Sequence, residues 1–205
     1  MKEQERMLAG ALYFAGDEEL TAARRRAKML TRNYNATTED ETARREELLR
    51  ALLGSAGARI WIEPPFRVDY GSNVTVGTDF YANYDCLILD VAPVTIGDRV
   101  MFGPRVCICT AAHPIDAAVR SRGLEYGKPI TIGDDVWLGA NVTVNPGVTI
   151  GSGTVIGSGS VVTRNIPAGV VAAGNPCRVL RTIGEEDRVR WQTAERDYDG
   201  VPEPR

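Results

Sequence analysis

The sequence lacks the marks of a membrane, secreted or nucleic-acid-binding protein. No apolar run approaches the ~20 residues that cross a bilayer, and the amino end, MKEQER, lacks the apolar core of a signal peptide. The net charge is only -3, and acidic residues flank the basic cluster at 24–26, which predicts a solvated helix face. We therefore expect a cytoplasmic chain with no membrane and no nucleic-acid partner.

Cysteine and histidine are also scarce. The four cysteines, Cys86, Cys107, Cys109 and Cys177, include no C-x-x-C pair, so we predict buried thiols and neither disulfides nor metal ligands. The one histidine is His113. A zinc site of the carbonic-anhydrase type needs three imidazoles, which one histidine per chain cannot supply even at the interfaces of a trimer. We expect no metal.

What the sequence does contain is a repeat of six residues, unbroken from Ile132 to Pro167. The first position is always aliphatic, and the fourth always tolerates positive φ. The first, fourth and fifth positions are, in turn, Ile132, Leu138, Val144, Ile150, Ile156, Val162; Asp135, Asn141, Gly147, Gly153, Gly159, Asn165; and Val136, Val142, Val148, Thr154, Ser160, Ile166. A corner in every six residues fits neither a helix nor a hairpin. It predicts a mainly β solenoid, the parallel β-helix of hexapeptide repeats.

A weaker form of the repeat precedes this segment. Its first positions are Tyr70, Val76, Ala82 and Ile88, then, after a slip of two, Ile96, Phe102 and Ile108; its corners are Asn73, Asp79 and Asp85. Residues 113–129, HPIDAAVRSRGLEYGKP, fit no repeat. Solenoids carry binding chemistry on such inserts, although a tolerated surface insertion is an equally good interpretation.

The segment before the repeats has helical spacing instead. We predict one helix over residues 3–14, a second capped by Asp17, and a third that follows a Thr38–Glu41 capping box and stops at Gly54. The expected organisation is a helical cap at 1–57, the β-helix at 58–182 with its insert at 113–129, and an extension at 183–205. After Pro176 we expect a short strand, then a charged helix near 185–196 and a Pro-containing tail that is partly disordered.

His113 lies where the repeats give way to the insert. Imidazole is the side chain best suited to act as a base near neutral pH. A lone loop histidine is more often a solvated residue than a catalyst, so its position alone leaves both interpretations open.

Several segments together carry a resemblance to a known family. ARRRAKMLTRNYN, IEPPFRVDYGSNVTVG, FYANYDC, TAAHPID, GKPITIGDDVWLGANVTVNPGVTIG and VVAAGNPCRV closely resemble the maltose and galactoside O-acetyltransferases, in order, from about residue 3 to about residue 183. The resemblance implies a left-handed β-helix, a homotrimer with active sites between neighbouring subunits, and transfer of acetyl from acetyl-CoA to a sugar hydroxyl.

The resemblance also implies roles for individual residues. The family's catalytic base matches His113, and we expect Glu125 to orient it, with a solvated loop acid as the alternative. Acceptor-binding positions match Arg24, Asp69 and Asn83. Acetyl-CoA positions match Ala140, Ser158, Thr163, Arg164, Arg178 and Arg181, and outward-facing Trp137 either walls the same groove or packs against a neighbour. Asp69 stands where the galactoside branch has serine, which favours a maltose-like or glucose-like acceptor.

Two other classes of function compete with this one. A different acyltransferase could use the same frame for another hydroxyl or amine acceptor, and a solenoid could serve as an interaction scaffold or an ice-binding surface. A scaffold would not need one histidine at the insert, and an ice-binding face would show regular outward threonines. The outward positions look mixed, which favours the enzyme. A backbone N–H near Ala140 is our candidate donor to the oxyanion.

Overall fold

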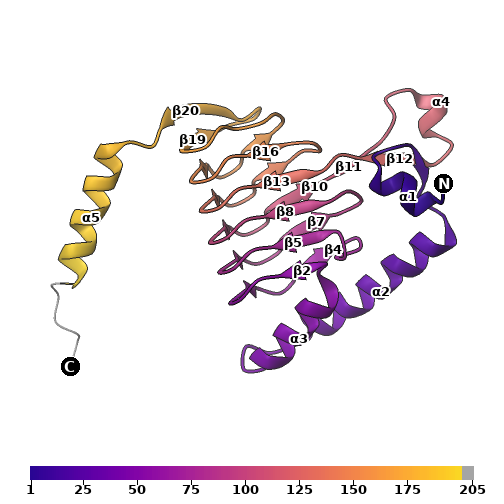
Figure 1. The fold of residues 1–205 in the computed structure, drawn as a ribbon, viewed down its shortest axis with the longest axis horizontal. Helices are drawn as coiled ribbons and strands as arrows, with labels where there is room; N and C mark the ends of the chain where they lie inside the picture. The colour runs from indigo at the N-terminus through magenta and orange to yellow at the C-terminus, as the bar shows by residue number, and fades with distance from the viewer. Residues whose placement is uncertain (200–205) are drawn as a thin grey trace.

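The computed structural model describes residues 1–199 and shows a parallel β-helix with three flat sheets (Figure 1). Sheet I contains β2 (Ser55–Ala56), β5 (Val74–Val76), β8 (Val94–Ile96), β13 (Ile130–Ile132) and β16 (Thr149–Ile150). Sheet II contains β3 (Trp61–Ile62), β6 (Tyr81–Ala82), β9 (Met101–Phe102), β14 (Trp137–Leu138), β17 (Val155–Ile156), β19 (Val170–Ala173) and β20 (Arg178–Thr182). Sheet III contains β4 (Arg67–Val68), β7 (Leu87–Leu89), β10 (Cys107–Cys109), β15 (Thr143–Val144) and β18 (Val161–Val162). The chain visits sheets I, II and III in turn, so the solenoid is predicted correctly and starts at β2, slightly before the expected boundary.

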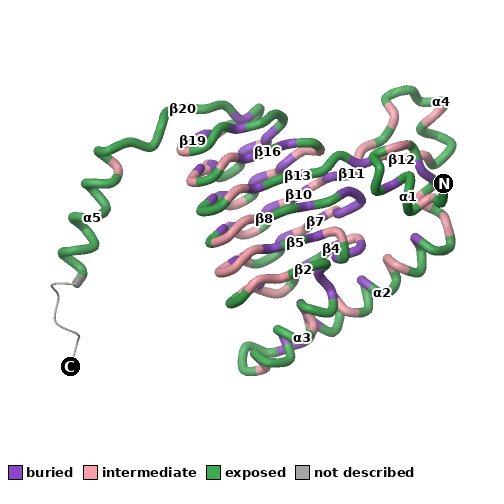
Figure 2. The backbone as a smooth tube through the Cα atoms, viewed as in Figure 1, coloured by how far each residue is buried: buried purple, intermediate pink, exposed green. Residues whose placement is uncertain are grey.

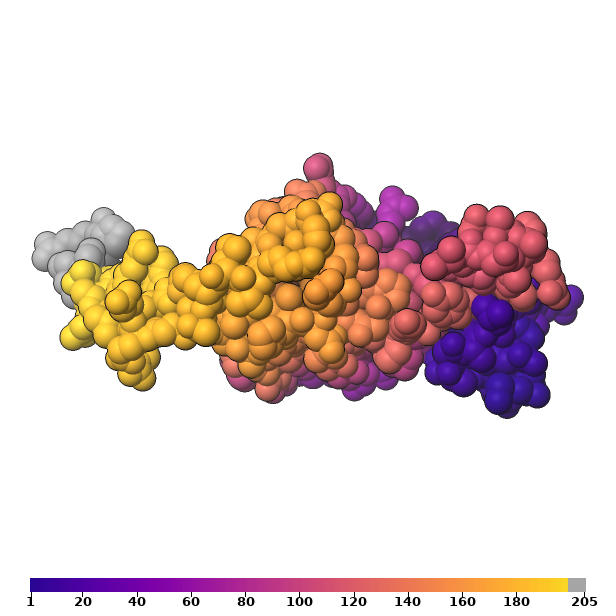
Figure 3. Space-filling model, turned by 90° about the horizontal axis from the view of Figure 1, so that it is seen from above, coloured from indigo at the N-terminus to yellow at the C-terminus, as the bar shows by residue number. Residues whose placement is uncertain are grey.

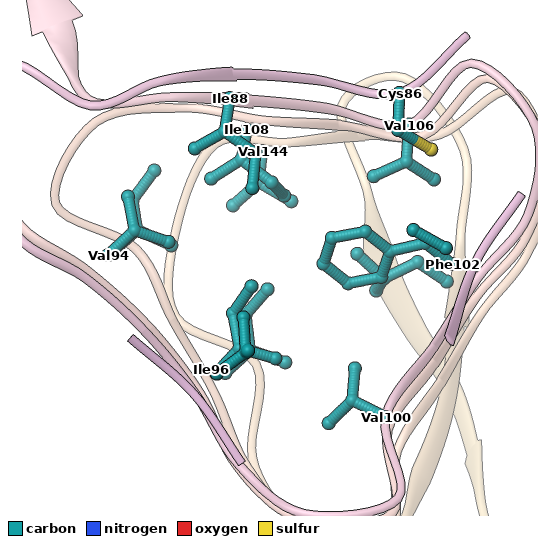
Figure 4. Close-up of a cluster of buried hydrophobic side chains, with 14 of the residues drawn as sticks. Cys86, Ile88, Val94, Ile96, Val100, Phe102, Val106, Ile108 and Val144 are labelled. Atoms are coloured by element: carbon teal, nitrogen blue, oxygen red, sulfur yellow. The ribbon is translucent and has the colours of Figure 1, made fainter. Parts of the chain in front are cut away.

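The inward positions of the repeat form the core. Figure 4 shows Ile88, Ile96 and Phe102 pointing from the three sheets into one triangular cross-section. All first and fifth positions of the repeat from Ile132 to Ile166 are buried, and the polar members Thr154 and Ser160 are bonded to backbone atoms. Each buried aliphatic side chain contributes roughly 1.5–3 kcal/mol. Tyr70 departs from the pattern because it is buried in a separate cluster with Met7, Tyr13, Leu20 and Val91.

The corners largely follow the prediction. Asp135, Asn141, Gly147, Gly153 and Gly159 have positive φ, as do Asp79 and Asp85. Asn73 and Asn165 do not, and the Asn165 side chain instead accepts the Thr149 N–H at 2.8 Å. Arg59, Arg99 and Arg105 have positive φ although nothing in their chemistry predicts it. Arg59 and Arg99 form bidentate ion pairs with Asp79 and Asp135, which lie on neighbouring coils. These ion pairs stabilise the strained corners.

The amino-terminal cap is helical with one exception. α1 (Glu3–Leu8) is shorter than predicted, because Tyr13–Phe14 form strand β1. α2 (Glu18–Asn35) is capped by Asp17 as predicted, and α3 (Thr42–Leu52) follows a turn in which Glu41 accepts the Thr38 N–H. Both helices pack against the first coil through buried residues such as Tyr34 and Leu49.

The insert is more ordered than its sequence suggests. It contains α4 (Ala117–Arg120) and β12 (Leu124–Gly127), and β12 lies between β1 and β11 (Ala111–Ala112) in an antiparallel sheet. Figure 3 shows the insert against the amino-terminal segment. The insert is therefore tied to the cap and is not a free loop.

The carboxyl end leaves the solenoid. β20 pairs with β19, and α5 (Glu185–Asp199) projects away from the body with an exposed surface (Figure 2). The strand after Pro176 and the helix near 185–196 are present as expected, and the end of the tail, residues 200–205, lies outside the described residues. Within residues 1–199 no helix is long and apolar enough to span a membrane.

The outward side chains differ from sheet to sheet. Sheet I carries an aligned, exposed row of Ser55, Thr75, Thr95, Thr131 and Thr149. Sheet II carries Trp61, Tyr81, Met101, Trp137, Val155 and Val171, and sheet III carries Leu87, Leu89, Cys107, Cys109, Thr143 and Val161. The expectation of mixed outward positions is therefore wrong for sheet I. Cys107 and Cys109 are half-buried on the outer surface, so only Cys86 and Cys177 are the buried thiols that we predicted.

Candidate functional site

One group of predicted residues gathers at the corner between sheets III and I. Asp69 follows β4, and Arg24 reaches this corner from α2, where it donates to the Tyr70 hydroxyl at 2.6 Å and to the Ala15 carbonyl at 2.6 Å. Tyr13 of β1 donates its hydroxyl to Glu125 Oε2 of β12 at 2.9 Å. The cap, the first coil and the insert therefore meet at a single polar cluster, which brings together Arg24, Asp69 and Glu125.

Burial governs the ionisation of this cluster. It raises the pKa of Asp69, against the attraction of Arg24, and nearby Glu125 raises it further. Burial also raises the pKa of Tyr13, again reinforced by Glu125. Tyr13 is therefore neutral and donates its hydroxyl hydrogen to Glu125.

A groove of about 570 Å³ adjoins Asp69 between α2 and sheet III. Lys28 and Arg32 of α2 line one side, and Leu87 and Leu89 of β7 form part of its floor. The groove is thus apolar beneath and cationic at its rim, and it continues the polar cluster along the outer surface of sheet III.

Sequence reasoning missed Asp90, which lies behind the same corner. Its side chain is completely buried, and burial raises its pKa to about 7, although backbone N–H groups of Tyr70 and Asn73 favour the charged form. The sequence offered only a weak signal, an acid two residues after the inward Ile88. The contacts that make Asp90 important are made with the preceding coil.

His113 follows β11 directly and is exposed on the insert. Within residues 1–199 its ring makes no hydrogen bond, and Glu125, its expected partner, is bonded to Tyr13. The cross-strand register pairs Ala111 with Gly127 and Ala112 with Tyr126. His113 therefore lies just beyond the paired residues of β11 and β12, next to the polar cluster.

A second group of predicted residues lies at the corner between sheets II and III. Asn83 accepts the Tyr84 N–H on its side-chain oxygen at 2.7 Å, and its amide NH2 group has no hydrogen-bond partner within residues 1–199. On later coils at the same corner, the Ala140 N–H is bonded to Ser158 Oγ at 3.1 Å. This N–H, our candidate oxyanion donor, is already used, and the Ser158 hydroxyl hydrogen is the donor that remains.

Trp137 and the three arginines predicted to bind acetyl-CoA lie on the coils nearest the carboxyl end of the solenoid. Trp137 of β14 is 49% exposed on the outer surface of sheet II. Thr163 and Arg164 follow β18 at the corner of sheets III and I, and Arg178 begins β20 beside Ala173. Arg181 makes a bidentate ion pair with Asp187, with N···O distances of 2.6 and 2.8 Å. This pair lowers the pKa of Asp187 to about 2. Arg164 and Arg178 have no such acidic partner within the described residues.

The two groups of predicted residues lie at different corners of the triangular β-helix. Asp69 is level with Leu89 at one end of β7, and Asn83 lies before the other end. The chain between Asn83 and Leu89 includes the corner at Asp85, which has a positive φ, and then runs along β7. The predicted residues therefore fall into two groups, one at each edge of sheet III.

Comparison with known proteins decides what kind of site this is. Residues 6–57 match the maltose acetyltransferase hexapeptide capping motif, and residues 129–164 match six bacterial transferase hexapeptide repeats. The galactoside O-acetyltransferase of Escherichia coli is 44% identical over 188 residues, covering 92% of this chain and 93% of that protein. The chain belongs to the maltose and galactoside O-acetyltransferase family.

Solved structures of this O-acetyltransferase family agree in fold. A maltose O-acetyltransferase from Clostridium difficile 630 is 54% identical with a TM-score of 0.89, covering 90% of this chain and 99% of that one. A galactoside acetyltransferase in complex with coenzyme A has the same TM-score at 44% identity, covering 92% of this chain and 94% of that one. The helical cap is thus a property of the family and is recognised with the repeats.

Proposed function

We propose that this O-acetyltransferase moves the acetyl group of acetyl-CoA to a hydroxyl of a maltose-like or glucose-like sugar, with His113 as the base. The observation that carries the proposal is the polar cluster at the corner of sheets III and I, beside the only histidine. The similar maltose and galactoside enzymes, one of them bound to coenzyme A, support the reaction class.

The chemistry needs one proton to move. A sugar hydroxyl is a poor nucleophile until a base removes its proton. His113 takes that proton as the oxygen bonds to the acetyl carbon, and the C–S bond then breaks. The same proton passes to the sulfur of the leaving coenzyme A, so the imidazole ends neutral and ready for the next cycle.

Glu125 is proposed to orient His113. Continuing the β11–β12 register by one residue sets His113 opposite Glu125, with Tyr13 on the other side of Glu125. Opposed side chains in such a sheet are about 5 Å apart at Cβ. Tyr13 would therefore hold one carboxylate oxygen while the other faces the ring and stabilises the imidazolium.

The acceptor and the cofactor are assigned to different residues. Arg24, Asp69 and Asn83 are proposed to hold sugar hydroxyls, which both donate and accept hydrogen bonds. Trp137, Ala140, Ser158 and Thr163 are proposed to line the extended cofactor groove. Arg164, Arg178 and Arg181 are proposed to bind its phosphates, and Arg181 must first leave Asp187.

A homotrimer is proposed because the site is divided between two edges. In a cyclic trimer each subunit offers one surface and receives a different one. Two sheets of this solenoid, II and III, carry large apolar or half-buried outward residues, and sheet I carries exposed threonines. Packing sheet II of one chain near sheet III of the next would bring Asn83 of one subunit toward Asp69 of its neighbour. The four free cysteines suit the reducing cytoplasm, where we place the enzyme.

A thiol-release assay tests the reaction. Purified protein with acetyl-CoA should release coenzyme A in the presence of maltose or glucose, and less with galactosides or amino sugars. His113→Ala should lower turnover by roughly 10²–10⁴-fold with acetyl-CoA binding retained. Near-normal turnover by this variant would end the proposed mechanism.

Paired substitutions test the division of roles. Asp69→Ala should raise the acceptor KM about tenfold to a hundredfold and leave the acetyl-CoA KM nearly unchanged, and Arg178→Ala should do the reverse, because each loses a charge-assisted bond. Equal shifts in both constants for both variants would show that the assignment is wrong.

A further inference from the structure

Asp90 makes an unusual set of contacts with the turn that carries Asp69. Its Oδ1 accepts the Asp69 N–H at 3.1 Å and the Tyr70 N–H at 2.9 Å, and its Oδ2 accepts the Asn73 N–H at 3.3 Å. The Asn73 side chain in turn donates to the Asp90 carbonyl at 2.7 Å. One side chain thus fixes the whole turn of residues 69–73 from the following coil.

The next coil shows that a charge is not needed merely to close such a corner. Leu89 pairs with Cys109, so Thr110 occupies the position that corresponds to Asp90. The Thr110 hydroxyl donates to the Leu89 carbonyl at 2.7 Å and accepts the Ala92 N–H at 2.9 Å. A neutral, smaller side chain therefore suffices there, and both residues are completely buried.

The carboxylate at Asp90 is costly by comparison. Within residues 1–199 no cation pairs with it, and Asp69 is a nearby acid that disfavours its charge. Burying an unpaired carboxylate is unfavourable unless several N–H groups bond to it. Its geometry matches that requirement, and the segment it holds is the one that presents Asp69 and Tyr70 to Arg24.

We propose that Asp90 is a positioning residue for the acceptor: its carboxylate shapes the 69–73 turn so that Asp69 faces the sugar. It touches neither sugar nor cofactor. This inference rests on the proposed acceptor role of Asp69 and adds the residue that sets its orientation.

The test compares Asp90→Asn with Asp98→Asn. The amide at position 90 keeps the Oδ1 acceptor but places an NH2 group against the Asn73 N–H. Asp98 is a matched control, because its Oδ1 accepts the Thr78 N–H of the preceding coil at 2.7 Å, at a corner away from the site. With acetyl-CoA and maltose we expect Asp90→Asn to raise the maltose KM about tenfold, with the acetyl-CoA KM changed less than twofold. Asp98→Asn should change neither constant.

Amide hydrogen exchange supplies a readout that is independent of catalysis. Exchange at Tyr70 and Asn73 should quicken in Asp90→Asn, while the amides of sheet II stay protected. An unchanged maltose KM, equal increases in both KM values, or unchanged exchange at the turn would overturn the inference. If the wild type acetylates none of the sugars, the proposed function fails, and the exchange rates still decide whether Asp90 holds the turn.

Discussion

The inward-facing residues of sheets I and III are alike, whereas their outward-facing residues differ in polarity and exposure. Their inward residues, such as Ile132 of sheet I and Ile88 of sheet III, are equally buried and aliphatic. Outward, sheet I shows exposed Ser55 on its first rung and exposed threonines on the next four, whereas sheet III shows half-buried Leu87, Leu89, Cys107 and Cys109. Since both sheets have the same geometry, the inward row specifies the solenoid and the outward row specifies what each face meets.

The contrast separates a solvated face from one whose two edges carry the candidate site residues. Threonine suits a solvated strand because it is β-branched and polar. Its row on sheet I is a single exposed rank, and the candidate site residues nearest to it lie at the corner that sheet I shares with sheet III. The regular threonines are therefore explained by solvation, and family membership removes the ice-binding alternative.

The largest effect should come from the inward row and should not depend on the face. Ile132→Ala and Ile88→Ala should each lower the free energy of unfolding by about 2–5 kcal/mol, because each leaves a cavity in a packed core. Chemical denaturation of the two variants measures this. Clearly unequal losses would show that the sheets do not share one core.

The next effect concerns the one charged inward position, Asp90. Its pKa is raised to about 7, above the value near 3.9 of an unfolded chain. Between these values the folded state holds a proton that the unfolded state has lost, so the free energy of unfolding should fall as pH rises from about 4 to about 7, by up to ~4 kcal/mol.

Denaturation curves across this pH range test the prediction. Asp90→Asn should flatten most of the slope, and a residual slope of the same sign should remain because burial also raises the pKa of Asp69. A variant with the full wild-type slope would place the titration elsewhere.

A smaller effect should distinguish the two outward rows. Leu87→Asp places a charge on the face assigned to subunit contact, and should shift the trimer toward monomer and lower turnover tenfold or more at micromolar concentration. Thr75→Asp, its counterpart on sheet I, should leave assembly unchanged. Sedimentation with activity measured on the same samples checks both, and a fully active monomeric wild type would refute the trimer.

The smallest effect should come from replacing outward-facing threonines of sheet I with alanine. Thr95→Ala and Thr131→Ala should each change stability by less than ~0.5 kcal/mol and leave both KM values unchanged, because the side chains are exposed and unpaired within the described residues. A marked loss of activity would show that sheet I also meets a ligand or partner.

Most of the fold could be predicted because its signals are local. The repeat from Ile132 to Pro167 places the aliphatic residues of its first and fifth positions in the core, and Asp, Asn or Gly marks its corners. Arg99 shows the limit: it adopts a positive φ that its type disfavours, and an ion pair with Asp135, distant in sequence, holds it there. The strand at Tyr13–Phe14 was missed for the same reason, since it exists only by pairing with β12.

The candidate site was predicted less completely. His113, Glu125 and Asp69 follow from the insert and from family resemblance, and the structure brings the last two into one cluster with Arg24. Asp90 and Tyr13 were missed because their importance lies in contacts across coils and with the cap. Their roles, like those of the resemblance-derived residues, are proposals for the experiments above.

The sequence by itself determined the solenoid, its corners and the family, because a six-residue period repeats the same steric choice at every turn and needs no distant partner. Only the tertiary structure decided that the insert pairs with β1, that the buried Asp90 side chain holds the turn of residues 69–73, and that the candidate residues divide between two edges of sheet III. These features depend on contacts between segments far apart in the chain, which no local pattern specifies.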